Sequence, residues 1–196
     1  MINPGHRSAE VLISRAALHA RIAELATELT PHFRAGEPPV AIAILKGSAM
    51  FLADLIRSMD VDIEVDFMSI TSYGSGRNSG VVRIVKDLDT DVTDRDVVIV
   101  EDIVDTGLTL TYLRRTLGQR GPRSLRAVTL LDKAARRIIP VELEHRGFEI
   151  PDVFVIGYGL DFQGRYRNVP EILQVNDLAH LAGDPGMLTG ELFTAG

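Results

Sequence analysis

One stretch of this chain, residues 97–117, constrains its fold more than any other: VVIVEDIVDTGLTLTYLRRTL. It opens with four β-branched residues, a run typical of a strand that is covered on both faces of a parallel sheet. Two carboxylates, Glu101 and Asp102, follow where such a strand would end. After the turn of residues 105–107, three leucines recur at helical spacing. The stretch therefore predicts a buried strand, an acidic pair, a tight turn and a helix, in that order.

The predicted end of that strand is suited to hold a phosphorylated sugar. Open parallel sheets bind ligands beyond the carboxyl ends of their strands, and the N–H groups of a helix's first turn attract phosphate. Gly107 lets the backbone approach the phosphate closely, and the hydroxyls of Thr106 and Thr109 add donors. The adjacent carboxylates Glu101 and Asp102 suit ribose hydroxyls or a hydrated divalent metal.

Two other interpretations of the same residues exist. The acidic pair can be a solvated strand end, with Asp105 or Thr106 as the N-cap of the helix. Asp-Thr-Gly also begins the active-site loop of aspartic proteases, which need two carboxylates that share a proton. This chain has one Asp-Thr-Gly, so a second would have to come from another copy in a dimer.

Composition narrows the class of protein. With 196 residues, 45% of them hydrophobic and 24% charged, the chain is expected to form a single domain over residues 1–196. The net charge of -6 argues against nucleic acid as a partner. The absence of cysteine excludes disulfides and thiolate chemistry. No stretch approaches the roughly 18 apolar residues of a membrane span, so we expect no membrane partner and a cytoplasmic location.

A second strand and loop precede the central stretch. Residues 14–29 carry an apolar stripe at helical spacing behind the capping residue Ser14. Val40–Leu45 is a second buried-strand candidate, followed by Lys46-Gly47-Ser48 and a helix-like segment, 49–59. Loops after neighbouring parallel strands face one crevice, where Lys46 and the loop amides can hold a second anionic group. The plain alternative is a lysine and a turn at a strand end.

Residues 71–80 carry three glycines and three serines between two predicted strands, 63–70 and 81–85. This tract is interpreted either as a plain hairpin connection or as a mobile lid that excludes water from the site.

The second half of the chain predicts further strands. Residues 125–131 form one and end at Asp132-Lys133; residues 153–160 are expected to be the last core strand, closed by Asp161. Residues 133–137 and 140–146 are interpreted as connections, and 172–175 as a short strand. The residues after it, rich in Gly and Pro, are expected to be loosely ordered.

Residues 97–110 resemble the phosphoribosyl-pyrophosphate-binding motif of the phosphoribosyltransferases. Other segments resemble the hypoxanthine-guanine branch of that family: residues 45–48, 72–73, 130–133 and 147–161, followed by Arg167. The resemblance covers about 40–167 and implies an α/β fold, with a parallel-sheet core flanked by helices at about 36–165. It also implies a small hood, built from residues 1–15 and about 162–196, and a mobile lid.

The resemblance assigns roles to particular residues. Asp105 would be the general base near the purine N7, and Lys133, Phe154, Val155 and Asp161 would form the purine site. Those that would bind phosphoribosyl pyrophosphate are Lys46, Gly47, Glu101, Asp102, Thr106, Gly107, Leu108, Thr109 and Arg167. Glu101, Asp102 and Asp161 would support Mg²⁺, and Ser72 and Tyr73 would belong to the lid. The family also implies a non-proline cis peptide at Leu45–Lys46.

The implied function is purine salvage. The enzyme would transfer the 5-phosphoribosyl group from phosphoribosyl pyrophosphate to hypoxanthine or guanine, giving IMP or GMP and pyrophosphate, with Mg²⁺ as cofactor. A xanthine-preferring enzyme and a non-catalytic regulator that binds phosphoribosyl pyrophosphate are the alternatives. Relatives imply a homodimer or homotetramer.

Overall fold

The structure, a computed structural model, describes residues 8–33, 37–73 and 81–193; for residues 72, 73, 81 and 82 it describes the backbone alone. The chain divides into two compact units. Unit 1 consists of Met1–His19 and Val153–Gly196, and unit 2 consists of Ala20–Asp152.

Unit 2 is built on a mixed sheet of six strands in the order β4-β3-β2-β5-β6-β7. All neighbours pair in parallel except the antiparallel pair β3 and β4. The strands are β2 (Val40–Leu45), β3 (Glu64–Tyr73), β4 (Val81–Lys86), β5 (Asp96–Val104), β6 (Ser124–Asp132) and β7 (His145–Glu149). The strands β2 and β5 are adjacent at the centre, as predicted, so the segments after them leave the same edge of the sheet.

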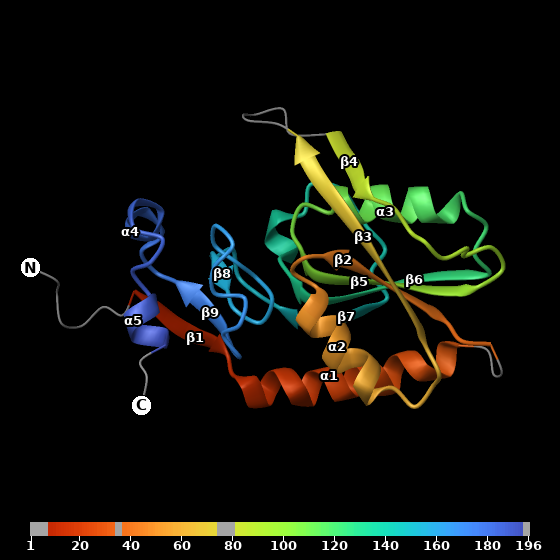
Figure 1. The fold of residues 1–196 in the computed structure, drawn as a ribbon, viewed down its shortest axis with the longest axis horizontal. Coiled ribbons are helices and arrows are strands. Elements are labelled where there is room, and N and C mark those ends of the chain that lie inside the picture. The colour runs from red at the N-terminus through yellow and green to blue at the C-terminus, as the bar shows by residue number, and fades with distance from the viewer. Residues whose placement is uncertain (1–7, 34–36, 74–80, 194–196) are drawn as a thin grey trace, which may run out of the picture. The chain divides into compact units, whose positions relative to one another are not determined.

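Helices cover both faces of this sheet (Figure 1). They are α1 (Arg15–Leu29), which crosses the boundary between the units, α2 (Ala49–Ser58) and α3 (Leu108–Gly118), with the short 3-10 turns η1 (Thr30–His32) and η2 (Ala134–Arg136). Ser14 Oγ accepts the Ala17 N–H at 3.3 Å, which confirms the predicted cap of α1.

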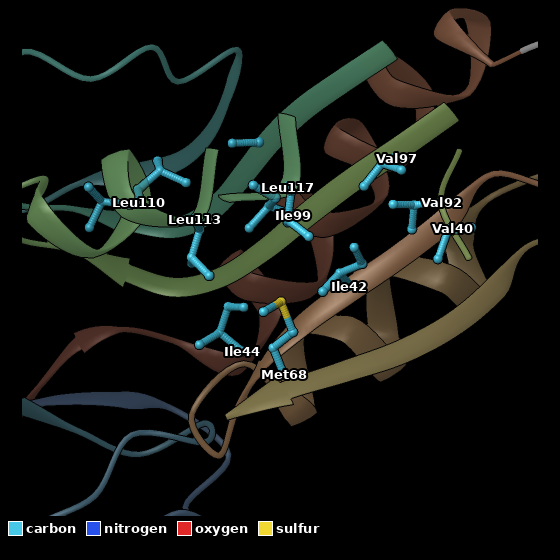
Figure 2. Close-up of a cluster of buried hydrophobic side chains, with 12 residues drawn as sticks. Val40, Ile42, Ile44, Met68, Val92, Val97, Ile99, Leu110, Leu113 and Leu117 are labelled. Atoms are coloured by element: carbon cyan, nitrogen blue, oxygen red, sulfur yellow. The ribbon is translucent and has the colours of Figure 1, made fainter. Parts of the chain in front are cut away.

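A cluster of buried apolar side chains joins α3 to one face of the sheet (Figure 2). Leu110, Leu113 and Leu117, the three leucines at helical spacing, are 0–1% exposed and pack with Ile42 and Ile99. Alternate residues of a strand face opposite ways. Ala41 and Ala43 of β2 and Val98 and Val100 of β5 therefore cover the other face, where they are also fully buried. The core strands are thus apolar on both faces, as parallel strands between helices must be.

Unit 1 contains a smaller antiparallel sheet in the order β1-β9-β8. Its strands are β1 (Ala9–Ile13), β9 (Ile172–Val175) and β8 (Val155–Ile156). The pair Ala9 and Val175 joins the two ends of the chain across this sheet. Two short helices follow, α4 (Leu178–Gly183) and α5 (Thr189–Leu192).

Several sequence predictions are wrong in detail. The expected last core strand, 153–160, is the short β8 of unit 1. The parallel strand after β6 is β7, which was not predicted; its first two residues were interpreted as part of a connection. The central strand continues past its acidic pair to Val104. The C-terminal residues expected to be loose form α4 and α5, with Leu181 and Leu188 fully buried.

Ser72 and Tyr73 lie at the end of β3, so that strand is longer than predicted. The remainder of the proposed lid, residues 74–80, lies outside the described residues. Among the helices that the structure describes, none has the length and apolar character needed to cross a membrane.

Candidate active site

Two loops meet at the carboxyl edge of β2 and β5. The first, Lys46-Gly47-Ser48, begins at a cis peptide bond between Leu45 and Lys46, which confirms the prediction for that bond. Ser48 is fully buried, and its Oγ donates to the Ile44 carbonyl at 2.6 Å, which ties the loop to the strand before it. The second loop, residues 105–107, leads from β5 into α3.

Gly47 lies directly against the acidic pair. A Cβ atom built on Gly47 would be 1.4 Å from Asp102 Oδ2 and 2.5 Å from Asp102 Cγ. No side chain can occupy that space while Asp102 stays in place. The first loop and the end of β5 therefore approach each other closely enough for one ligand to contact both.

The second loop turns at Gly107, whose φ of 86° is in the left-handed region. A Cβ there would be 2.9 Å from the Ile139 carbonyl oxygen, so glycine is required for space as well as for conformation. The Thr111 N–H donates to the Gly107 carbonyl at 3.0 Å and begins the helical bonding of α3. Leu108 and Thr109 are the first residues of α3, so their N–H groups are at the positive end of the helix dipole.

The segment after β6 holds this second loop from outside. The Lys133 N–H donates to the Val104 carbonyl at 2.9 Å. The Ile138 and Ile139 N–H groups donate to the Thr106 carbonyl at 3.0 and 3.3 Å. A trans peptide directs its C=O and N–H to opposite sides. The Val104 and Thr106 carbonyls point toward residues 133–139. The N–H groups of the same two peptides, which belong to Asp105 and Gly107, therefore face the other way, as an anion-binding nest requires.

The two acidic residues have different environments. Glu101 is 5% exposed; burial, and then the neighbouring Asp102 carboxylate, raise the pKa of Glu101 well above its ordinary value of 4.5. Asp102 is partly exposed, and its Oδ1 accepts the Ile103 N–H at 2.8 Å. A bound cation or a ribose hydroxyl beside Glu101 would offset the cost of ionising it.

Asp105 is paired with an arginine that the sequence analysis did not single out. Arg136 Nε is 3.1 Å from Asp105 Oδ1, and Arg136 Nη1 is 3.5 Å from Asp152 Oδ1. The adjacent Arg137 donates to the Asp105 carbonyl at 3.2 Å. Their position in the sequence could have indicated this contact, because both arginines closely follow Lys133 at the carboxyl end of β6. Lys133 itself is 7% exposed.

The remaining predicted site residues belong to unit 1. Arg167 pairs with Asp161 through Nη2 and Oδ1 at 2.6 Å, and its Nη1 donates to the Gly159 carbonyl at 2.6 Å. Phe154 packs edge-on against Phe162, with ring centroids 5.8 Å apart at 84°. Val155 is 6% exposed in β8. The Asp161–Arg167 pair was not foreseen, because each was assigned separately to a ligand.

Within unit 2 the structure thus brings together the residues of the two loops, the acidic pair and the segment that begins at Lys133. Of Ser72 and Tyr73 it describes the backbone in β3. In the described part of the chain, no group of three or more His, Asp or Glu side chains is placed to hold a metal ion by itself.

Comparison with known proteins places these motifs in a family. Residues 13–163 match the phosphoribosyl transferase domain. The chain is similar to the hypoxanthine phosphoribosyltransferase of Salmonella typhimurium, 49% identical over 85% of this chain and 94% of that one. It is 47% identical to the hypoxanthine-guanine phosphoribosyltransferase of Bacillus subtilis over 85% and 93%. The crystal structure of a Staphylococcus aureus hypoxanthine phosphoribosyltransferase matches with a TM-score of 0.84 and 42% identity, over 92% of this chain and 98% of that one.

Proposed function

The chain belongs to the phosphoribosyl transferase family, and on that premise we propose the reaction and the residues that perform it. It is a pentosyltransferase of purine salvage, similar to enzymes named for hypoxanthine and guanine. The bond from the anomeric carbon of phosphoribosyl pyrophosphate to its pyrophosphate oxygen breaks, and a bond from that carbon to a nitrogen of a 6-oxopurine forms. The products are IMP or GMP and pyrophosphate.

One observation carries the proposal for the sugar-phosphate site: the close approach of Gly47 to the Asp102 carboxylate. It brings a loop that carries a lysine next to an acidic pair, at the edge where open parallel sheets bind ligands. A molecule with a phosphate at one end, ribose hydroxyls in the middle and a pyrophosphate fits this order of groups.

The second loop is proposed to hold the 5-phosphate. The backbone N–H groups at Thr106, Gly107, Leu108 and Thr109, with the two threonine hydroxyls, supply donors that suit its oxygens. Gly107 supports this role because its φ of 86° favours glycine, and a Cβ there would meet the Ile139 carbonyl oxygen at 2.9 Å and displace the turn.

The leaving pyrophosphate gains negative charge as the bond breaks. Lys46, the Gly47 amide and Arg167 are proposed to neutralise it. Arg167 is paired with Asp161 at 2.6 Å, so contact with pyrophosphate requires it to share or exchange that partner.

Mg²⁺ is proposed as the cofactor, and the residues present fit it. Mg²⁺ keeps several waters and needs only one or two carboxylates together with substrate phosphates. Glu101 and Asp102 supply adjacent carboxylates. A cation beside them would lower the raised pKa of Glu101 and favour its ionised form. Asp161 is proposed to hold a second Mg²⁺. When bound, Mg²⁺ supplies positive charge against the pyrophosphate.

The purine site is proposed to combine a base, a donor and a stacking ring. Asp105 accepts the proton that the purine loses as its new bond forms. The nearly buried Lys133 donates to the 6-oxygen, whereas a 6-amino group would leave two donors opposed, which disfavours adenine. Phe154 stacks on the ring, and the Val155 backbone and Asp161 complete the pocket.

We also propose, from the resemblance, a homodimer or homotetramer in the cytoplasm.

The test supplies purified protein with phosphoribosyl pyrophosphate, Mg²⁺ and one of hypoxanthine, guanine, xanthine or adenine. Chromatography of the products measures which nucleotide forms, and EDTA tests the metal requirement. We expect IMP and GMP, little AMP, and no product with EDTA. A faster reaction with xanthine would establish the xanthine-preferring alternative, and no product with any base would contradict the enzymatic proposal.

A further inference from the structure

Arg137 holds the second loop, residues 105–107, at the peptide that follows Asp105. Its Nη1 donates to the Asp105 carbonyl at 3.2 Å, while its Nη2 donates to Asp132 Oδ1. The Asp132 side chain is 4% exposed and that of Arg137 is 19% exposed. The guanidinium is therefore fixed by a buried carboxylate on one side and by the loop on the other.

The neighbouring carbonyls of this loop are held by backbone. Those of Val104 and Thr106 accept N–H groups from residues 133–139. The Asp105 carbonyl accepts a side chain instead, so the orientation of the Asp105–Thr106 peptide depends on Arg137. The N–H of that peptide belongs to Thr106 and lies opposite the carbonyl. Arg137 thus sets the direction of one phosphate donor and the backbone from which the Asp105 carboxylate extends.

The stem of Arg137 also packs on the turn. A Cβ built on Gly107 would be 3.1 Å from Arg137 Cδ. The terminal nitrogens of Arg137 are engaged with Asp132 and the loop carbonyl, so its contacts place it behind the loop rather than on the ligand.

We propose that Arg137, anchored by Asp132, is a positioning residue for phosphoribosyl transfer. It fixes the Asp105–Thr106 peptide so that the Thr106 N–H meets the 5-phosphate and Asp105 meets the purine. This inference rests on the proposed function. Small displacements of groups near the reacting atoms cost about 10²-fold in rate, so losing the contact should affect kinetics more than folding.

The first test is Arg137→Met, which keeps the apolar stem and removes both donors. We expect KM for phosphoribosyl pyrophosphate to rise about tenfold and kcat/KM to fall about 10- to 100-fold. KM for hypoxanthine should change less than about threefold, because its main contacts lie elsewhere. Arg137→Lys should recover part of the loss, since lysine supplies a charge but not the two-pronged geometry.

A matched control is Arg146→Met. Arg146 Nη1 also approaches Asp132, at 3.5 Å from Oδ2, but its other ion pair is with Glu149, outside the loop, and its side chain is 57% exposed. Its kinetic constants should match those of the wild type. Asp132→Asn should reproduce the kinetic pattern of Arg137→Met. The double variant should have a kcat/KM close to that of either single variant, because each substitution breaks the same Arg137–Asp132 pair.

The outcomes separate this inference from the proposed function. If the wild type forms no nucleotide, the proposed function fails. If the wild type is active and folded Arg137→Met keeps its constants, or loses affinity equally for both substrates, Arg137 has no positioning role. If Arg137→Met does not fold, the folded Arg137→Lys variant provides the test. An affinity for phosphoribosyl pyrophosphate equal to that of the wild type would contradict the inference. An affinity weaker by about threefold or more would support it.

Discussion

Asp105 is held at two points by consecutive arginines. Arg136 approaches its carboxylate at 3.1 Å, and Arg137 donates to its carbonyl at 3.2 Å. Asp105 is the proposed general base, and a general base must be oriented toward the proton that it accepts before its basicity matters. These contacts restrict both the backbone and the carboxylate of Asp105.

At this residue, Asp105→Asn should slow turnover by about 10²–10⁴, the usual loss for an acid–base group. KM for phosphoribosyl pyrophosphate should change little, because the amide keeps the shape of the loop. Steady-state kinetics with hypoxanthine measure both constants. Asp152→Asn is the control, since Asp152 shares Arg136 at 3.5 Å but lies outside the loop. Unchanged turnover of Asp105→Asn would remove Asp105 from the mechanism.

The glycines show how far residue type alone can predict a site. Gly107 was expected to allow close approach of the backbone, and its φ of 86° agrees with a turn that favours glycine. The sequence predicted that Gly47 lies in an anion-binding loop. That its Cα faces Asp102 follows from the pairing of β2 with β5, which brings together residues far apart in the chain.

At the scale of elements, strands that are buried on both faces were predicted well. The strand β2 begins and ends where its apolar run does. The edge strand β7 was missed because its sequence, HRGFE, contains charged residues and a glycine rather than an apolar run. At β8 the error is the reverse, because the apolar run predicted a long strand. The strand ends after Ile156, where Gly157 turns the chain with a φ of 95°.

One carboxylate ties the connection before β5 to β3. Asp66 Oδ2 accepts the N–H groups of Asp89 and Thr90 at 2.8 Å each, and its Oδ1 accepts that of Phe67 at 2.6 Å. Burial opposes ionisation of Asp66, but the donors outweigh it and lower the pKa of Asp66 below 3.8. A carboxyl with a lowered folded-state pKa stabilises the fold above its ordinary pKa and loses that effect in acid.

Asp66→Asn should therefore lower the free energy of unfolding at pH 7 by about 1–3 kcal/mol, the cost of buried donors left poorly paired. Between about pH 5 and pH 3 the wild type should lose stability more steeply than the variant. Urea denaturation across this range measures both effects. The exposed Asp60→Asn is the control and should follow the wild type. Parallel pH curves for wild type and Asp66→Asn would contradict the role of Asp66.

At the scale of the whole molecule, an acidic chain is proposed to bind a polyanion. The net charge is -6, so attraction cannot come from the overall field. It must come from locally placed donors: loop amides, Lys46 and the N-terminus of α3. The acidic pair adds to this requirement, because it places two more carboxylates beside the proposed phosphate site.

Glu101 links the charge of the site to the stability of the molecule. Its raised folded-state pKa favours the protonated form, so the free energy of unfolding should decrease as pH rises from about 4.5 through the raised pKa. Glu101→Gln should remove this contribution and flatten the decline of Tm in that window. Calorimetry over a pH series measures it.

The control for this experiment is Glu142→Gln, whose side chain is 75% exposed and whose removal should leave the slope unchanged. Mg²⁺ with pyrophosphate should raise the Tm of the wild type more at high pH than at low pH, because ionised Glu101 binds the cation better. A wild-type slope that Glu101→Gln does not alter would show that Glu101 is ionised in the folded protein.

The sequence by itself determined the local features: buried strands from runs of β-branched residues, helices from apolar periodicity, and a tight turn at Asp-Thr-Gly after an acidic pair. These depend on neighbours within a few residues. Only the tertiary structure decided that β1 pairs with β9, that Gly47 faces Asp102, and that Arg136 and Arg137 hold Asp105. Such contacts join distant parts of the chain, and their partners are selected by packing and strand order rather than by local pattern.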